Sequence, residues 1–190
     1  MRNRWILGTV ICAAGLCAAA LGGIAQTKSK AHVEIPVVAA NPEDVSTIEA
    51  IVQADYESIS GGVGVPRNWG RDLSLFDPHA WFVAFSTDSK SGVVKKQSFN
   101  EQGYVDGSDA LLVKVGWSEH ELAHKIERFG NVATVLSSYE GKVASKGEAY
   151  SRGVNIYQLY FDGKRWWILS IVWDEERPGN PIPPELLPKN

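Results

Sequence analysis

Two apolar runs near the end of the chain, joined by a turn signal, constrain the fold more than any other feature of the sequence. Residues 154–161 and 165–173 are rich in β-branched and aromatic side chains, and Asp162-Gly163 lies between them. Asp-Gly between such runs is a strong signal for a β-hairpin. The C-terminal part of the chain is therefore predicted to be antiparallel sheet.

The second strand of this hairpin is apolar on both faces. With strict alternation, one face carries Trp167, Leu169, Ile171 and Trp173, and the other carries Trp166, Ile168 and Val172. A strand that is apolar on both faces is covered on both faces. Because helices can cover only one of them, we expect a second subunit on the other and predict a homodimer through the sheet.

Helical signals lie in the N-terminal half of the chain. Asn41-Pro42 followed by Glu43-Asp44 is typical of a helix start, and apolar residues then recur at helical spacing as far as Ile59. Further elements are predicted as a short helix within 65–76, strands over 80–86, 93–99 and 132–139, and a helix or loop over 104–115. Helices first and strands afterwards predict an α+β fold, with helices packed on one face of a mostly antiparallel sheet.

Residues 1–25 have the layout of a secretory signal peptide. Arg2 and Arg4 precede an uncharged apolar run, and small residues stand before a cut at Gln26. An uncleaved membrane anchor is the alternative, because the run is nearly long enough to span a bilayer. The layout predicts export to the periplasm or the extracellular space, with no membrane contact after cleavage. Residues 26–40 are then an irregular leader, and 41–190 one domain with a Pro-rich tail.

Cysteine content and charge exclude several classes of protein. Cys12 and Cys17 both lie in the signal segment, so the mature chain has no disulfide framework, thiolate metal site or cysteine nucleophile. Removing Arg2 and Arg4 from 19 basic residues leaves 17 against 22 acidic ones, a net charge of −5. This balance gives no support for nucleic-acid or anionic-membrane binding.

His120-Glu121-Leu122-Ala123-His124 matches the H-E-x-x-H motif of zinc hydrolases. On a helix the two histidines share one face and can bind one zinc ion with the Glu as general base, and Glu148 is a candidate third ligand. On a strand, residues four apart are separated by roughly 13 Å and cannot share a zinc ion. Glu127 stands where the extended motif has Gly. A zinc hydrolase is therefore an alternative, and no metal is predicted.

Several stretches carry a family resemblance: NWGRDLSLFDPHA at 68–80, ERFGNVATV at 127–135 with SYE at 138–140, IYQL at 156–159, DGKRWWI at 162–168 and WD at 173–174. In this order they resemble the nuclear transport factor 2-like superfamily, especially bacterial members akin to the polyketide cyclase and ketosteroid isomerase group. The tail ERPGNPIP is similar to that of exported members. The resemblance implies a cone-shaped roll, in which a curved sheet encloses N-terminal helices and leaves a pocket at its wide end. It also makes residues 127–135 a strand.

Enzymes of this superfamily often pair an acid with a Tyr or His in an apolar cavity, where burial shifts pKa values. The resemblance therefore implies catalytic candidates Tyr56, His120, His124 and Asp174, and ligand-binding candidates Tyr56, Trp69, Trp117 and Trp173. Each has a structural alternative. Tyr56 fits a core position, the histidines a sheet edge, Asp174 the start of a polar tail, and the tryptophans the core or a dimer interface.

The sequence predicts an exported pocket protein that binds a small, largely apolar molecule and needs no cofactor. Lyase or isomerase activity by proton transfer is an option within the same fold. One fold hosts enzymes and non-enzymes alike. A non-catalytic interaction module that dimerises through its sheet is therefore an alternative, beside the zinc hydrolase.

Overall fold

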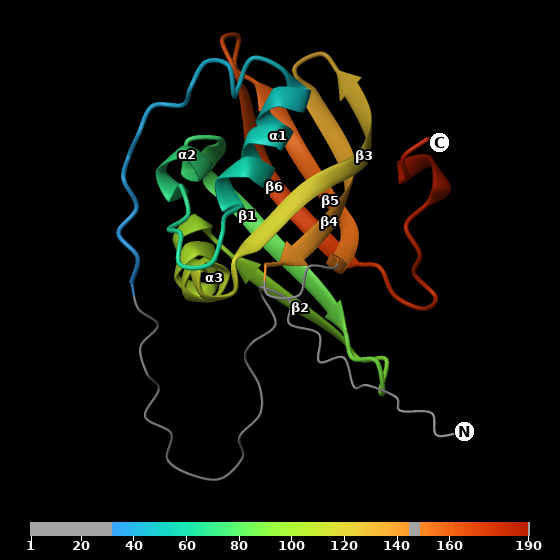
Figure 1. Cartoon of the computed structure of the whole chain (residues 1–190). Helices are drawn as coiled ribbons and strands as arrows, with labels where there is room; N and C mark the ends of the chain where they lie inside the picture. Colours follow the sequence, from blue (N-terminus) through green and yellow to red (C-terminus); the bar gives the residue numbers. More distant parts are fainter. Residues whose placement is uncertain (1–31, 145–148, 190) are drawn as a thin grey trace, which may run out of the picture.

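The computed structural model of the chain describes residues 32–144 and 149–189, and Figure 1 shows helices packed against one face of a curved sheet. The elements in chain order are α1 (Ile48–Ile59), α2 (Trp69–Leu73), β1 (Phe76–Thr87), β2 (Val94–Phe99), α3 (Glu101–Val115), β3 (Trp117–Phe129), β4 (Val132–Val143), β5 (Ala149–Phe161), β6 (Trp166–Glu175) and the 3-10 turn η1 (Pro184–Leu186). The predicted signal segment and Glu148 lie outside the described residues. No helix within the described ranges is long and apolar enough to cross a membrane.

Side-chain caps set the ends of the helices. α1 begins at Ile48 because the Thr47 hydroxyl accepts from the amide of Ala50 at 3.0 Å. The predicted start at Asn41-Pro42 forms a separate turn instead, in which the Asp44 amide donates to the Asn41 carbonyl. Residues 104–115, predicted as a helix or loop, belong to the helix α3. This helix ends where Gly116 adopts a left-handed conformation with φ 66°.

The described strands form one sheet in the order β2-β1-β6-β5-β4-β3. The β1–β6 pair is parallel, and the neighbouring pairs on either side are antiparallel. β5 and β6 form the predicted hairpin, in which the Asp162 carboxylate accepts from the amides of Lys164 and Arg165. The predicted α+β fold with a mostly antiparallel sheet is confirmed.

β-Bulges on β3 and β6 change which side chains share a face. On β6 the register shifts opposite Gln158 and Leu159, whose partners are Ser170 and Ile168, so Leu169 has no partner. Such an extra residue moves every following side chain to the other face. Trp166 and Ile168 therefore share the inner face with Ile171 and Trp173, where they pack in the core or line the inner cavity. The strict alternation expected for this strand does not hold.

The hydrophobic core fills the space between α1 and the inner face of the sheet. Ile51, Val135 and Ile168 are among its fully buried members. On the outer face, the C-terminal tail packs Ile182 and Leu186 against the sheet, and the Ser138 hydroxyl donates to the Leu186 carbonyl. The chain itself thus covers part of the outer face, and the homodimer stays a prediction.

Gly153 marks a close approach between β5 and β6. A Cβ atom at this position would lie 2.4 Å from the Asp174 carbonyl oxygen and 2.8 Å from the Tyr139 hydroxyl. Gly153→Ala should lower the free energy of unfolding by about 1–3 kcal/mol, because backbone must move to accept the methyl group. Urea denaturation measures the loss. Gln158→Ala, at an exposed position of the same strand, is the control and should change stability by less than about 0.5 kcal/mol. Equal stability of Gly153→Ala and the wild type would contradict this packing.

Candidate functional site

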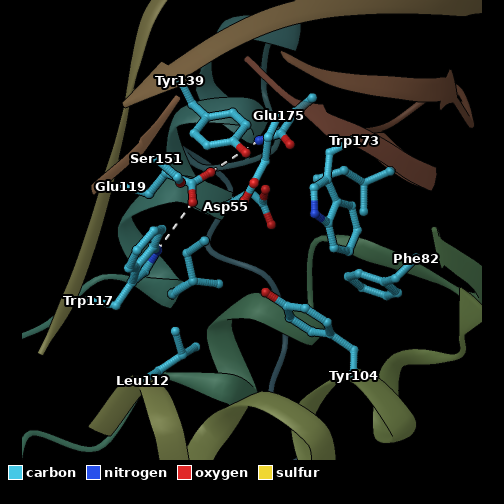
Figure 2. Close-up of a pocket in the computed structure, with 13 residues that line it drawn as sticks. Asp55, Phe82, Tyr104, Leu112, Trp117, Glu119, Tyr139, Ser151, Trp173 and Glu175 are labelled. Carbon is cyan, nitrogen blue, oxygen red and sulfur yellow. Dashed lines mark hydrogen bonds between the residues drawn. The ribbon is translucent and has the colours of Figure 1, made fainter. Parts of the chain in front are cut away.

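A cavity of about 60 Å³ lies between α1, α3 and the inner face of the sheet (Figure 2). Ligand pockets commonly reach several hundred Å³, so this cavity limits its ligand to a few non-hydrogen atoms. Among the described residues that line it, the carboxyl groups are those of Asp55, Glu119 and Glu175. The aromatic side chains on its walls are Phe82, Tyr104, Trp117, Tyr139 and Trp173.

Glu119 on β3 presents its carboxyl group to this cavity. Asn155 Nδ2 donates to Oε1 at 3.2 Å, and Trp117 Nε1 donates to Oε2 at 3.2 Å. Burial raises the pKa of Glu119 to about 7; these hydrogen bonds lower it, and the nearby carboxylates of Asp55 and Glu175 raise it further. Near neutral pH the group therefore exists in both protonation states, and it can accept or donate a proton.

Asp55 on α1 reaches the cavity as one half of a buried carboxyl pair. Burial raises the pKa of Asp55 to about 6, against the hydrogen bonds from Tyr157 and Asp72. The Tyr157 hydroxyl donates to Asp55 Oδ2 at 2.7 Å, and the Ser58 hydroxyl donates to Asp72 Oδ1 at 2.5 Å. Burial, and then repulsion from Asp55, raise the pKa of Asp72 well above its ordinary range. A proton shared by the pair is therefore favoured on Asp72, and Asp55 is the member that ionises more readily.

A hydrogen-bond chain behind the cavity orients Asn155. The Ser137 hydroxyl donates to Glu121 Oε1 at 2.6 Å, so the Tyr56 hydroxyl, 2.7 Å away, must donate to Ser137. The oxygen of Tyr56 in turn accepts from Asn155 Nδ2 at 3.2 Å. Tyr56 is 1% exposed and does not line the cavity. It acts on the cavity through Asn155.

The two histidines of the H-E-x-x-H string lie on the strand β3, and a bulge separates them. The register shifts between Glu121 and Ala123, which pair with the consecutive residues Tyr139 and Ser138. His120 consequently faces outward. His124 faces inward, and its Nδ1 forms a hydrogen bond with Glu121 Oε2 at 2.8 Å. Residues on opposite faces cannot bind one zinc ion together. In the described parts of the chain, no three His, Cys, Asp or Glu side chains form a group that could hold a metal.

The other predicted site residues are divided between the cavity and the remainder of the fold. Trp117 and Trp173 line the cavity. Trp69 does not; it is buried beside α3, where its Nε1 donates to Asp109 Oδ1 at 2.6 Å. Asp174 faces the outer side and pairs with Arg177 at 2.7 Å.

The sequence analysis did not identify Asp55, Glu119 and Glu175, the acids that line the cavity. A signal existed for Asp55, because it lies four residues after Ile51 and four before Ile59 on the apolar stripe of α1. An Asp at a core-facing helix position is conspicuous because this residue is almost never fully buried unless it is paired. Glu119 stands in an alternating polar segment and carries no comparable signal.

A larger groove of about 380 Å³ lies on the outer face between the sheet and the C-terminal tail. Its lining is mainly apolar, and its acids Asp174 and Glu176 are ion-paired with Arg177 and Arg152. Groups whose pKa values burial brings near neutrality line the inner cavity instead. The inner cavity is therefore the candidate site.

No protein-family model matches the sequence, and no curated protein matches it. Solved structures with a similar fold include an NTF-2-like protein of unknown function from Silicibacter pomeroyi, at 14% identity and a TM-score of 0.43, with 69% of this chain and 94% of that chain covered. An NTF2-like protein of unknown function from Shewanella baltica matches at 10% identity and a TM-score of 0.40, covering 68% and 90%. A protein of unknown function with a cystatin-like fold from Nostoc punctiforme matches at 11% identity and a TM-score of 0.49, covering 68% and 93%. Similarity at this level concerns the fold alone.

Glu119 should make the protein less stable as pH rises. Its folded-state pKa of about 7 exceeds the ordinary 4.5. Its contribution to the free energy of unfolding is therefore fully present at low pH and is lost as pH rises through about 7. Glu119→Gln should therefore reduce the difference in unfolding free energy between about pH 5 and about pH 8 by about 2 kcal/mol. Urea denaturation at both pH values measures it.

Glu127→Gln is the matched control, because Glu127 is an exposed residue of the same strand. The pKa of Glu127 is lowered by its hydrogen bond from Lys125, so its loss should not reduce the pH dependence. A Glu119→Gln variant with the pH dependence of the wild type would contradict the raised pKa.

Proposed function

We propose that the protein binds a small molecule in the inner cavity and catalyses proton transfer on it through Glu119 and Asp55. The observation that carries the proposal is the placement of two carboxyl groups, with pKa values of about 7 and about 6, on the wall of one aromatic cavity. Pairs of acids whose environments set different pKa values are suited to combined acid and base roles.

The two carboxyl groups can work together without building net charge. Between about pH 6 and about pH 7, Asp55 is mostly ionised and Glu119 mostly protonated. Asp55 then accepts a proton from a carbon next to a carbonyl group, while Glu119 donates its proton to the carbonyl oxygen. The product is a neutral enol, and return of a proton to the same carbon completes an exchange. Where that carbon carries a hydroxyl group the intermediate is an enediol, and protonation of the former carbonyl carbon with loss of the hydroxyl proton completes an isomerisation.

Hydrogen bonds hold both groups in place for this reaction. Trp117 and Asn155 each donate to one lone pair on a different oxygen of Glu119. The remaining lone pairs, or the proton when the group is protonated, are not used by these two donors. Tyr157 fixes Asp55 in the same way. Donors that are already in position need no reorganisation during the reaction.

A second candidate function is a non-catalytic interaction module that uses the outer face of the sheet. It is favoured by the apolar groove and by exposed Ile156 and Leu169 on that face. A homodimer through this face and export directed by residues 1–25 remain proposals that accompany either function.

Proton transfer can be tested with hydroxyacetone, a small neutral ketone suited to the volume of the cavity. The wild type should catalyse deuterium exchange at its carbon-bound protons in D₂O, followed by proton NMR, with an optimum between about pH 6 and about pH 7. Glu119→Gln should lower the rate at least roughly 100-fold while it keeps the shape of the side chain.

Glu127→Gln again serves as the control and should exchange as fast as the wild type, because Glu127 lies outside the cavity. Exchange at the buffer rate with wild-type protein, or equal rates for Glu119→Gln and the wild type, would overturn the proposed function.

A further inference from the structure

The lining of the inner cavity is acidic and aromatic at once. Three of the described residues that line it are acids, five are aromatic, and none is Lys, Arg or His. Such a lining repels anions and offers a neutral ligand few donors. Both of its main components attract a positive charge, since carboxylates do so directly and aromatic faces do so through their quadrupole.

The aromatic walls stand at an angle to each other. Phe82 and Tyr104 are stacked, with centroids 4.9 Å apart and planes 9° apart. Trp173 meets Tyr104 edge to face at 6.2 Å and 79°. In Figure 2, Trp117 lies on the opposite side of the cavity, and Asp55 and Glu119 lie between it and Trp173. A ligand in the cavity would thus contact aromatic rings on more than one side.

The charged groups around the cavity come from separate elements. Asp55 belongs to α1, Glu119 to β3 and Glu175 to β6, while protonated Asp72 on α2 stands behind Asp55. The buried carboxyls raise one another's pKa values through repulsion. A cation between them would relieve this repulsion and favour their ionised forms.

We propose that the ligand of the inner cavity is a small organic cation, an ammonium or methylated ammonium group held between the carboxylates of Asp55, Glu119 and Glu175 and the rings of Trp117 and Trp173. The inference rests on the ligand-binding part of the proposed function and names the chemical class of the ligand. It does not depend on the proton-transfer step.

Pairs of probes with equal numbers of non-hydrogen atoms test the charge. Methylammonium is compared with methanol, and tetramethylammonium with tert-butanol, by NMR titration of the full-length protein at about pH 8. At least one cation should bind at least roughly tenfold more tightly than its neutral partner. Calorimetry at about pH 7, where Glu119 is about half protonated, in two buffers of different ionisation enthalpy should show proton release on binding, which a neutral ligand would not cause.

Substitutions at Glu119 and Trp173 distinguish the effects of the negative charge and of the aromatic ring on cation binding from a general effect on folding. Glu119→Gln removes the charge and keeps one oxygen acceptor, which serves either Trp117 or Asn155. It should weaken cation binding roughly tenfold, with binding of the neutral probe unchanged. Trp173→Leu should weaken it by a similar factor, and Trp173→Phe, which keeps a ring, should weaken it less.

Failure to bind either cation, or equal affinity for cations and neutral partners, would overturn the inference. If the protein still catalyses deuterium exchange of hydroxyacetone in that case, the proposed proton transfer stands and only the proposed positive charge of the ligand is wrong. If the cations bind and hydroxyacetone does not exchange, the inference stands and the catalytic proposal falls.

Discussion

Removing Asp55, Asp72 and Glu119 from water is the energetic constraint on which the rest of the site depends. Burial of an acid favours its protonated form and is tolerated only where donors meet the remaining oxygens. Here Tyr157, Ser58, Asn155 and Trp117 supply those donors. Hydrogen bonds from the helices and strands therefore stabilise titratable carboxyl groups in and beside one cavity. Asp55 and Glu119 are suited to proton transfer because burial brings their pKa values to about 6 and about 7.

Irregularities in the sheet decide which residues reach this cavity. The bulge on β6 lets Trp166 and Ile168 fill the core while Trp173 and Glu175, farther along the strand, line the cavity. The bulge on β3 similarly separates His120 from His124. Bulges commonly re-aim side chains beside functional sites. The two histidines of an H-E-x-x-H string on such a strand cannot bind the same metal ion.

Local signals carried the prediction of the fold. Asp162-Gly163 predicts the hairpin that is observed, and the helical spacing up to Ile59 predicts α1. These features depend on residues close together in the chain. The bulges have no comparable signal, because Leu169 is an ordinary strand residue and its extra position depends on the partner strand.

The site was less predictable because its contacts join distant parts of the chain. Tyr56 and Asn155 are 99 positions apart, and Asp55 and Tyr157 are 102 apart. Trp117 and Trp173 line the cavity, whereas Asp174 faces outward because it follows Trp173 on β6 and successive strand residues point to opposite faces.

Direct titration of Glu119 tests the central claim that burial keeps this carboxyl near neutrality in the folded cavity. Protein with ¹³C-labelled Glu side chains, assigned by comparison with Glu119→Gln, gives the pKa from the pH dependence of the carboxyl carbon shift. A midpoint of about 7 is the predicted result. A midpoint at the ordinary value of 4.5 would contradict the account.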